Sequence, residues 1–113
     1  MSKVPVHFQV EVAQWARETF PHATPKTIIS HLLREAEELV HAATEPASLR
    51  AAQLGIAEES ADILLLLFHL CDRCSIDLLN ATAMKFERNK RRQWGAPDAE
   101  GVAEHIRSAQ GEV

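Results

Sequence analysis

The chain has 113 residues, of which 46% are hydrophobic and 25% charged, and its formal net charge is −4. A chain of this length builds one domain with a single core and is marginal as an isolated monomer. The acidic balance argues against general binding to nucleic acids or to membrane surfaces.

The first residues, MSKVPVHFQV, lack the apolar run and the cleavage site of a signal peptide. The longest apolar run, residues 63–68, is too short to span a bilayer. The chain has only two cysteines, Cys71 and Cys74, and we expect both to be reduced. These features predict a cytoplasmic protein, located in the host cytoplasm if a phage encodes it.

The sequence predicts an all-α fold, because it has 4 glycines, no tyrosine and no segment that alternates with period two. A first helix is predicted over residues 6–19, with Trp15 on its inward apolar stripe. A second helix is predicted over residues 25–44, since Thr24 offers a hydroxyl N-cap and Pro25 suits the first helical position.

A third helix is predicted from a Ser48 cap to about residue 74, and a fourth over residues 77–94. Gly55 weakens the third helix locally but allows a neighbouring helix to approach closely. We interpret residues 1–113 as a single domain, with a core over about 6–94 and a tail over 95–113. Because four helices bury so many apolar positions poorly in one small monomer, we expect the bundle to be completed by oligomerisation.

Two acidic pairs lie at the edges of apolar stripes, where acids are rare. Glu35 and Glu38 fall in the second predicted helix, and Glu59 and Asp62 fall in the third. Each pair is spaced by three residues, so each projects from one face of its helix. Carboxylates on an inward face are costly unless a cation satisfies them, and four oxygen donors suit Mg²⁺. The sequence therefore predicts a metal site made by these four residues.

The fourth predicted helix carries a polar stripe that suits phosphate. Lys85, Asn89 and Arg92 recur at spacings of four and three residues, so they share one face. Two cations and an amide on one face form a candidate clamp for phosphate oxygens. We interpret the other cations at this end as a solvated basic terminus that complements the helix dipole.

Few side chains are available to contact a base. Trp15 and Trp94 are candidates for stacking, with core packing or anchoring of an interface as the alternative for both. His31 precedes Glu35 by four residues and His69 follows Asp62 by seven, so both histidines could face the acids. We interpret them as core histidines or as residues behind the ligands, because Mg²⁺ prefers oxygen.

Taken together, these segments resemble the MazG-like all-α nucleoside triphosphate pyrophosphohydrolases, specifically their dATP/dGTP pyrophosphohydrolase branch. The resemblance covers about residues 14–94 and rests on four motifs in order: QWARETFP, E-x-x-E, E-x-x-D and K-x-x-x-N-x-x-R-x-W. The chain departs from the family at Arg34, where many relatives carry a second glutamate. The number of metal ions in each site therefore stays open.

The resemblance implies hydrolysis of dGTP or dATP between the α- and β-phosphates, giving a monophosphate and pyrophosphate. It implies catalytic and metal-binding roles for the two acidic pairs, with Mg²⁺ as the cofactor and Mn²⁺ as a substitute. Glu38 would activate water, Lys85 and Arg92 would bind phosphate oxygens, and Asn89 would position a phosphate or the sugar. Relatives of this kind form dimers or dimers of dimers, so a homodimer or homotetramer is expected.

Two alternatives remain at this point. The same fold could act on a pyrimidine or modified deoxynucleoside triphosphate, since the base preference follows from the resemblance alone. A different class of protein is a non-catalytic helical dimerisation module, in which the acidic pairs would be surface charge. Release of pyrophosphate, and stabilisation of the fold by metal, separate the enzyme from the module.

Overall fold

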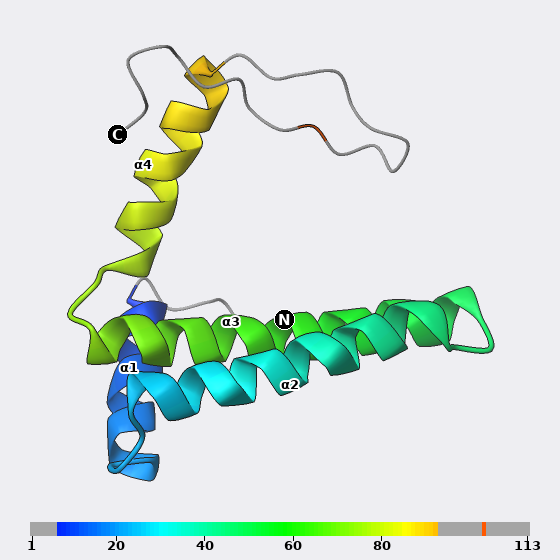
Figure 1. Cartoon of the computed structure of the whole chain (residues 1–113), viewed down its shortest axis with the longest axis horizontal. Helices are drawn as coiled ribbons and strands as arrows, with labels where there is room; N and C mark the ends of the chain where they lie inside the picture. The colour runs from blue at the N-terminus through cyan, green and yellow to red at the C-terminus, as the bar shows by residue number, and fades with distance from the viewer. Residues whose placement is uncertain (1–6, 93–102, 104–113) are drawn as a thin grey trace. The chain divides into compact units, whose positions relative to one another are not determined.

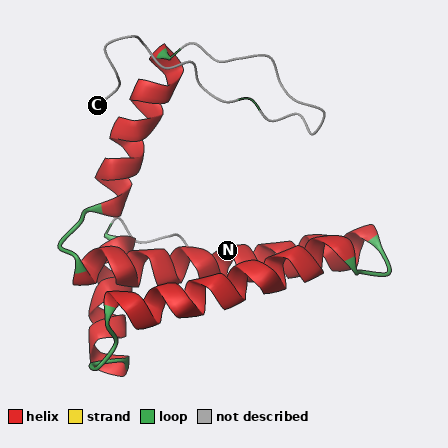
Figure 2. Cartoon of the chain, in the orientation of Figure 1, coloured by secondary structure: helices red, strands yellow, loops and turns green. Residues whose placement is uncertain are grey.

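The computed structural model describes residues 7–92 and 103, and the regular structure of this part of the chain is entirely helical (Figure 2). The helices are α1 (Phe8–Thr19), α2 (Pro25–Thr44), α3 (Leu49–Arg73) and α4 (Leu78–Arg91). The all-α prediction is confirmed. The chain divides after Leu78 into two compact units, so α1 to α3 are described together and α4 by itself. The first helix begins at Phe8 and the fourth ends at Arg91, so both are shorter than the predicted ranges 6–19 and 77–94. Val6, Trp94 and the tail, apart from residue 103, lie outside the described residues.

Side-chain caps fix the starts of α2 and α3 where the sequence predicts them. The Thr24 hydroxyl accepts a hydrogen bond from the Thr27 amide at 3.2 Å, and the Thr27 hydroxyl accepts one from the Thr24 amide at 3.0 Å. Ser48 caps α3 by accepting a hydrogen bond from the Ala51 amide at 3.1 Å. These bonds satisfy amides that have no partner inside a helix, and so set the register of both acidic pairs.

The helices α2 and α3 pack along each other as an antiparallel hairpin (Figure 1). Gly55 of α3 lies against α2 so closely that a Cβ atom there would stand 3.0 Å from the Cβ of Ala42. The expected close approach at Gly55 is confirmed. Two small residues facing each other let the helix axes approach, which brings side chains of both helices within reach.

The helix α1 crosses the end of this hairpin where α2 begins and α3 ends (Figure 1). The apolar core of the described residues lies at this crossing and consists of Val12, Ala13, Ala16, Ile28, Phe68 and Cys71. The predicted inward stripe of α1 is wrong in one respect, since Trp15 is 54% exposed. The buried face includes Ala13 and Ala16 because small residues allow α1 to pack closely, and this places Trp15 on the flank.

Polar contacts hold α1 against the end of α3. Arg17 donates a hydrogen bond to the Asp72 carboxylate at 2.6 Å, and Arg73 donates to the backbone carbonyl of Phe20 at 2.9 Å. The rings of Phe8 and Phe68 meet edge to face, with centroids 6.1 Å apart. These contacts hold both ends of α1 against the last turns of α3.

The α3 helix ends in a tight turn at Ser75, which has a φ of 57°. The Ile76 amide donates to the Cys71 carbonyl at 2.8 Å, and the Ser75 amide donates to the Asp72 carbonyl at 3.1 Å. This pair of bonds is a Schellman motif, in which glycine usually occupies the left-handed position. A serine there carries a small conformational cost.

Large apolar side chains remain exposed along both helices of the hairpin. Those on α2 and α3 that are more than a third exposed are Ile29, Leu33, Val40, Leu49, Leu54, Ile56, Leu64 and Leu65. Exposed apolar side chains that gather into a large patch are typical of an interface with another protein. Within the described residues, the helices are too short or too polar to cross a bilayer.

Candidate active site

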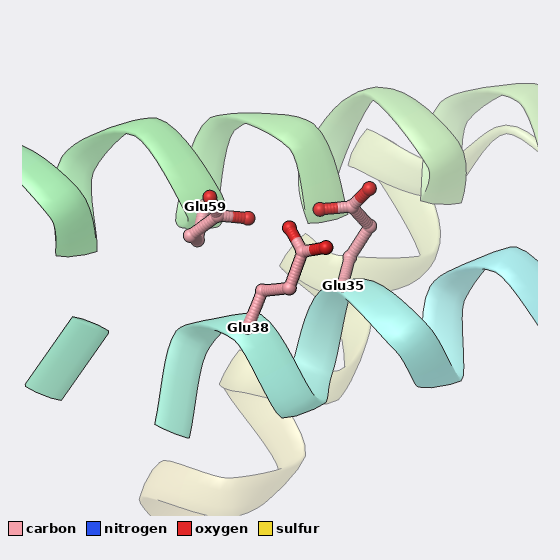
Figure 3. A group of neighbouring side chains, drawn as sticks. All are labelled: Glu35, Glu38 and Glu59. Atoms are coloured by element: carbon pink, nitrogen blue, oxygen red, sulfur yellow. The ribbon is translucent and has the colours of Figure 1, made fainter. Parts of the chain in front are cut away.

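Three of the four predicted acids converge between the helices of the hairpin. Glu35 and Glu38 project from α2 toward Glu59 on α3 (Figure 3). One carboxylate oxygen from each of the three lies within 4.8 Å of the other two. Glu35 and Glu59 are half-buried, whereas Glu38 is exposed. The geometry therefore gathers three hard oxygen donors at one point.

This cluster is electrostatically strained. The Oε2 atoms of Glu35 and Glu59 are buried and have no hydrogen-bond partner. A hydrogen bond with Glu35, together with burial and the negative charges of Glu38, Glu35 and Asp62, raises the pKa of Glu59 to about 7. Unpaired buried oxygens and crowded like charges are both relieved by a bound cation. Oxygen donors suit Mg²⁺ and Mn²⁺, so the residues present fit a divalent ion.

Asp62, the fourth predicted acid, lies one helical turn beyond Glu59. Among the described residues it is not part of the group that lies within 4.8 Å. Its charge nevertheless contributes to the raised pKa of Glu59, and its side chain lines the adjoining cavity together with Glu35. The arrangement is thus a cluster of three carboxylates with a fourth at its edge.

A cavity of about 220 Å³ adjoins the carboxylates on the side of α1. Its lining is mostly apolar and consists of Val12, Trp15, Ala16, Phe20, His31, Glu35, Asp62, Leu65, Leu66 and His69. Trp15 meets Phe20 edge to face at 5.5 Å between ring centroids, and Phe20 lies 6.0 Å from the His69 ring. An acidic rim on a cavity with aromatic walls suits a ligand that is charged at one end and flat and apolar at the other.

The predicted phosphate clamp falls on α4, in the second unit. Arg92 donates a hydrogen bond to the Asn89 side-chain oxygen at 3.0 Å, and both residues are half-buried, whereas Lys85 is exposed. Lys85 and Asn89 lie on α4, whereas Arg92 directly follows its last residue, Arg91. The phosphate clamp stays a prediction. Trp94 lies outside the described residues.

The sequence indicates the acidic residues of the site but not all of the aromatic residues that line the cavity. Phe20 was not singled out, although it lies in the family-like segment QWARETFP. His69 is buried, which agrees with its interpretation as a core histidine, and it also lines the same cavity as Asp62. Its spacing of seven residues from Asp62 places both on one face of α3, as the sequence indicates.

Comparisons with known proteins all identify relatives among the dATP/dGTP and MazG-like pyrophosphohydrolases. A model of the dATP/dGTP pyrophosphohydrolase family matches residues 8–113. A dATP/dGTP diphosphohydrolase of Cyanophage S-2L is 33% identical over 98 residues, which cover 87% of this chain and 84% of the relative. A solved structure of the Cyanophage S-2L MazG-like pyrophosphohydrolase, described as bound to dGDP and three catalytic Mn²⁺ ions per active site, superimposes with a TM-score of 0.69. That match has 29% identity and covers 96% of this chain and 97% of the other.

Proposed function

The chain belongs to the dATP/dGTP pyrophosphohydrolase family and is a nucleoside triphosphate pyrophosphohydrolase, and we propose that it hydrolyses dATP and dGTP with a divalent metal ion. The products are the deoxynucleoside monophosphate and pyrophosphate. The observation that carries this proposal is the convergence of Glu35, Glu38 and Glu59 beside a cavity with aromatic walls.

In this proposal Glu35, Glu38, Glu59 and Asp62 hold the metal. Mg²⁺ is the proposed cofactor and Mn²⁺ a substitute, and the catalytic Mn²⁺ ions described for the S-2L structure support a dependence on divalent metal. A divalent ion supplies positive charge to the phosphate oxygens and makes a coordinated water more acidic. The unpaired oxygens of Glu35 and Glu59 are the donors best placed to accept such an ion.

The remaining chemistry belongs to side chains of the protein. Glu38 is the exposed member of the cluster, so it is the carboxylate that orients a water and accepts its proton. Lys85 and Arg92 bind non-bridging phosphate oxygens and stabilise the charge that develops on the leaving pyrophosphate. Asn89, which already accepts a hydrogen bond from Arg92, positions a phosphate or the sugar.

The aromatic side chains at the cavity bind the base of the nucleotide. Trp15 is half exposed at the cavity rather than packed in the core, which favours stacking over the structural alternative. Stacking on an aromatic ring is typically worth about 1–3 kcal/mol per base and does not distinguish bases strongly. Trp94 is proposed as a second contact from the K-x-x-x-N-x-x-R-x-W motif of the sequence.

We also propose that the active form is a homodimer or homotetramer. The exposed apolar side chains of α2 and α3 are the surface that a second copy would cover. Membership of an enzyme family disfavours a non-catalytic dimerisation module. A preference for a pyrimidine or modified nucleotide stays as an outcome of the experiment below.

The experiment is a panel of the common ribo- and deoxynucleoside triphosphates with Mg²⁺, followed by identification of the products. We expect pyrophosphate and a monophosphate from dATP and dGTP, and no turnover after EDTA treatment or in Glu38→Gln. Orthophosphate as the first product would contradict cleavage between the α- and β-phosphates. Faster turnover of a pyrimidine nucleotide would overturn the purine preference.

A further inference from the structure

We propose that His69 determines which base the enzyme accepts, through a hydrogen bond between its ring nitrogen Nε2 and an edge of the base. This role rests on the proposed function, because it requires the phosphates of the nucleotide to lie at the carboxylate cluster. It assigns selection among bases to a residue of α3 that lies outside both the carboxylate cluster and the α4 stripe.

His69 is buried without the partner that a buried polar group needs. It is 5% exposed and is the single polar side chain in the buried class among the described residues. Its Nε2 atom makes no hydrogen bond. Buried polar atoms in folded proteins are nearly always paired, so an exception in a ligand cavity indicates a partner that the ligand supplies.

The position of His69 matches the length of a nucleotide. Asp62 and His69 are seven residues apart on α3, which is about two turns, or roughly 10 Å along the helix axis. Both line the same cavity, whose volume of about 220 Å³ lies below the roughly 300–1,000 Å³ typical of pockets for whole ligands. The cavity therefore suits the base end of a nucleotide whose phosphates lie outside it, at the acids.

Different side chains around His69 provide the affinity for a base and the selectivity among bases. Phe20 packs on the imidazole with the ring planes inclined by 33°, and Trp15 packs edge-on against Phe20. Aromatic rings attract any base. A group that forms a hydrogen bond with the base discriminates much more sharply, because the wrong base leaves it unpaired.

Phe20 is the partly exposed ring beside His69. It is 48% exposed, its ring centroid lies 6.0 Å from that of His69, and its backbone carbonyl accepts a hydrogen bond from Arg73. Because Nε2 has almost no accessible surface, the proposed hydrogen bond requires the side chains around Nε2 to move when the base enters.

The protonation state of His69 suits recognition of a neutral base. Burial, and the neighbouring charge of Arg73, lower the pKa of His69, while Asp72 acts in the opposite direction. The neutral ring presents one N–H donor and one acceptor nitrogen. Both kinds of group find partners on the edges of a purine.

The test combines variants of His69 with analogues of dGTP that each change one edge of the base. The analogues are 7-deaza-dGTP, which lacks N7, dITP, which lacks the 2-amino group, and the triphosphate of 2-aminopurine deoxyriboside, which lacks O6 and the N1–H donor. The variants are His69→Phe, His69→Gln and His69→Asn. Glutamine places an amide near the position of Nε2, whereas asparagine places one near Nδ1. His41→Phe, on the exposed surface of α2, is the matched control.

In the wild type we expect at least one analogue to lower kcat/KM by about tenfold to a hundredfold relative to dGTP. The same analogue should lose little in His69→Phe and His69→Asn, while His69→Gln and His41→Phe keep the wild-type discrimination. If His69→Phe does not fold, the contrast between the glutamine and asparagine variants carries the test. Equal losses in every variant, or none in the wild type, would overturn the role of His69.

The same experiment separates this inference from the proposed function. Pyrophosphate release from dGTP by the wild type depends on the proposed function alone. A wild type that releases pyrophosphate but shows no coupling between His69 and the base overturns only the role of His69. A wild type that releases no pyrophosphate from any triphosphate overturns the proposed function. A shift in KM with kcat unchanged marks a contact with the base rather than a general structural defect.

Discussion

The acidic hairpin of α2 and α3 and the basic helix α4 carry opposite charges and organise them differently. The acids come from two helices that pack closely at Gly55 and Ala42, and they meet between those helices. Lys85 and Asn89 of α4, and Arg92 directly after it, are predicted to share a face from their spacing alone, and Arg92 donates a hydrogen bond to Asn89. Convergence across two helices needs tertiary packing, whereas a stripe on one helix needs only the helical period.

The two regions also differ in how well their charges are satisfied. Lys90 of α4 pairs with Glu87 at 2.8 Å and lies 4.7 Å above the Phe86 ring, so its charge is balanced locally. The cluster around Glu59 is instead crowded by like charges. Repulsion among carboxylates that does not stabilise the fold is typical of a functional site where a bound ligand relieves it.

The largest effect should follow from neutralising the acids. We expect Glu38→Gln and Asp62→Asn each to lower pyrophosphate release by about a hundredfold or more, with the helical circular dichroism signal unchanged. Glu37→Gln is the matched control, because Glu37 neighbours Glu38 but is exposed and outside the cluster. Wild-type turnover in Glu38→Gln would remove that residue from the chemistry.

A smaller loss of activity should follow from removing the predicted phosphate-binding cations Lys85 and Arg92. Lys85→Ala and Arg92→Ala should each lower kcat/KM by roughly tenfold to a hundredfold, because each removes one charged contact to phosphate. Lys90→Ala is the control, since its charge is balanced by Glu87. If all three variants lose activity equally, the basic end of α4 acts through its total charge rather than through a defined stripe.

The close packing of the hairpin predicts an effect on stability. Gly55→Leu should lower the free energy of unfolding by about 1–3 kcal/mol, because even a Cβ atom there meets Ala42 at 3.0 Å. Ala57→Leu places the same side chain on an exposed position of α3 and should change stability little. Thermal and urea unfolding measure both. An unchanged unfolding midpoint for Gly55→Leu would mean that the helices can separate at no cost.

The pKa of Glu59 predicts a pH dependence of the metal-free protein. Its value in the folded state, about 7, lies above the ordinary 4.5, so the folded protein holds this proton more tightly than the unfolded chain. The contribution of Glu59 to stability is present below pH 4.5 and is lost as the pH rises through 7. Glu59→Gln should flatten this loss in thermal unfolding between pH 5 and 8. If the stability of Glu59→Gln depends on pH as that of the wild type does, Glu59 does not have the raised pKa that the crowded carboxylates imply.

The sequence predicted local features better than packing. Thr24 and Ser48 marked the helix starts because a cap needs only nearby backbone amides. The spacing of the acids placed Glu35 and Glu38 on one face, but not their 4.8 Å approach to Glu59. Trp15 was placed on the inward stripe because periodicity does not show that Ala13 and Ala16 form the contact face. The cavity joins α1, α2 and α3, so no single segment revealed it.

Direct binding of Mn²⁺ to the nucleotide-free protein tests most closely whether the acids of α2 and α3 form a metal site. Isothermal titration calorimetry at pH 7.5 would compare the wild type with Glu59→Gln and with Glu58→Gln, an exposed neighbour. We expect the wild type and Glu58→Gln to bind with the same affinity, and Glu59→Gln to bind at least about tenfold more weakly. Equal binding by all three proteins, or no binding by the wild type, would contradict the account.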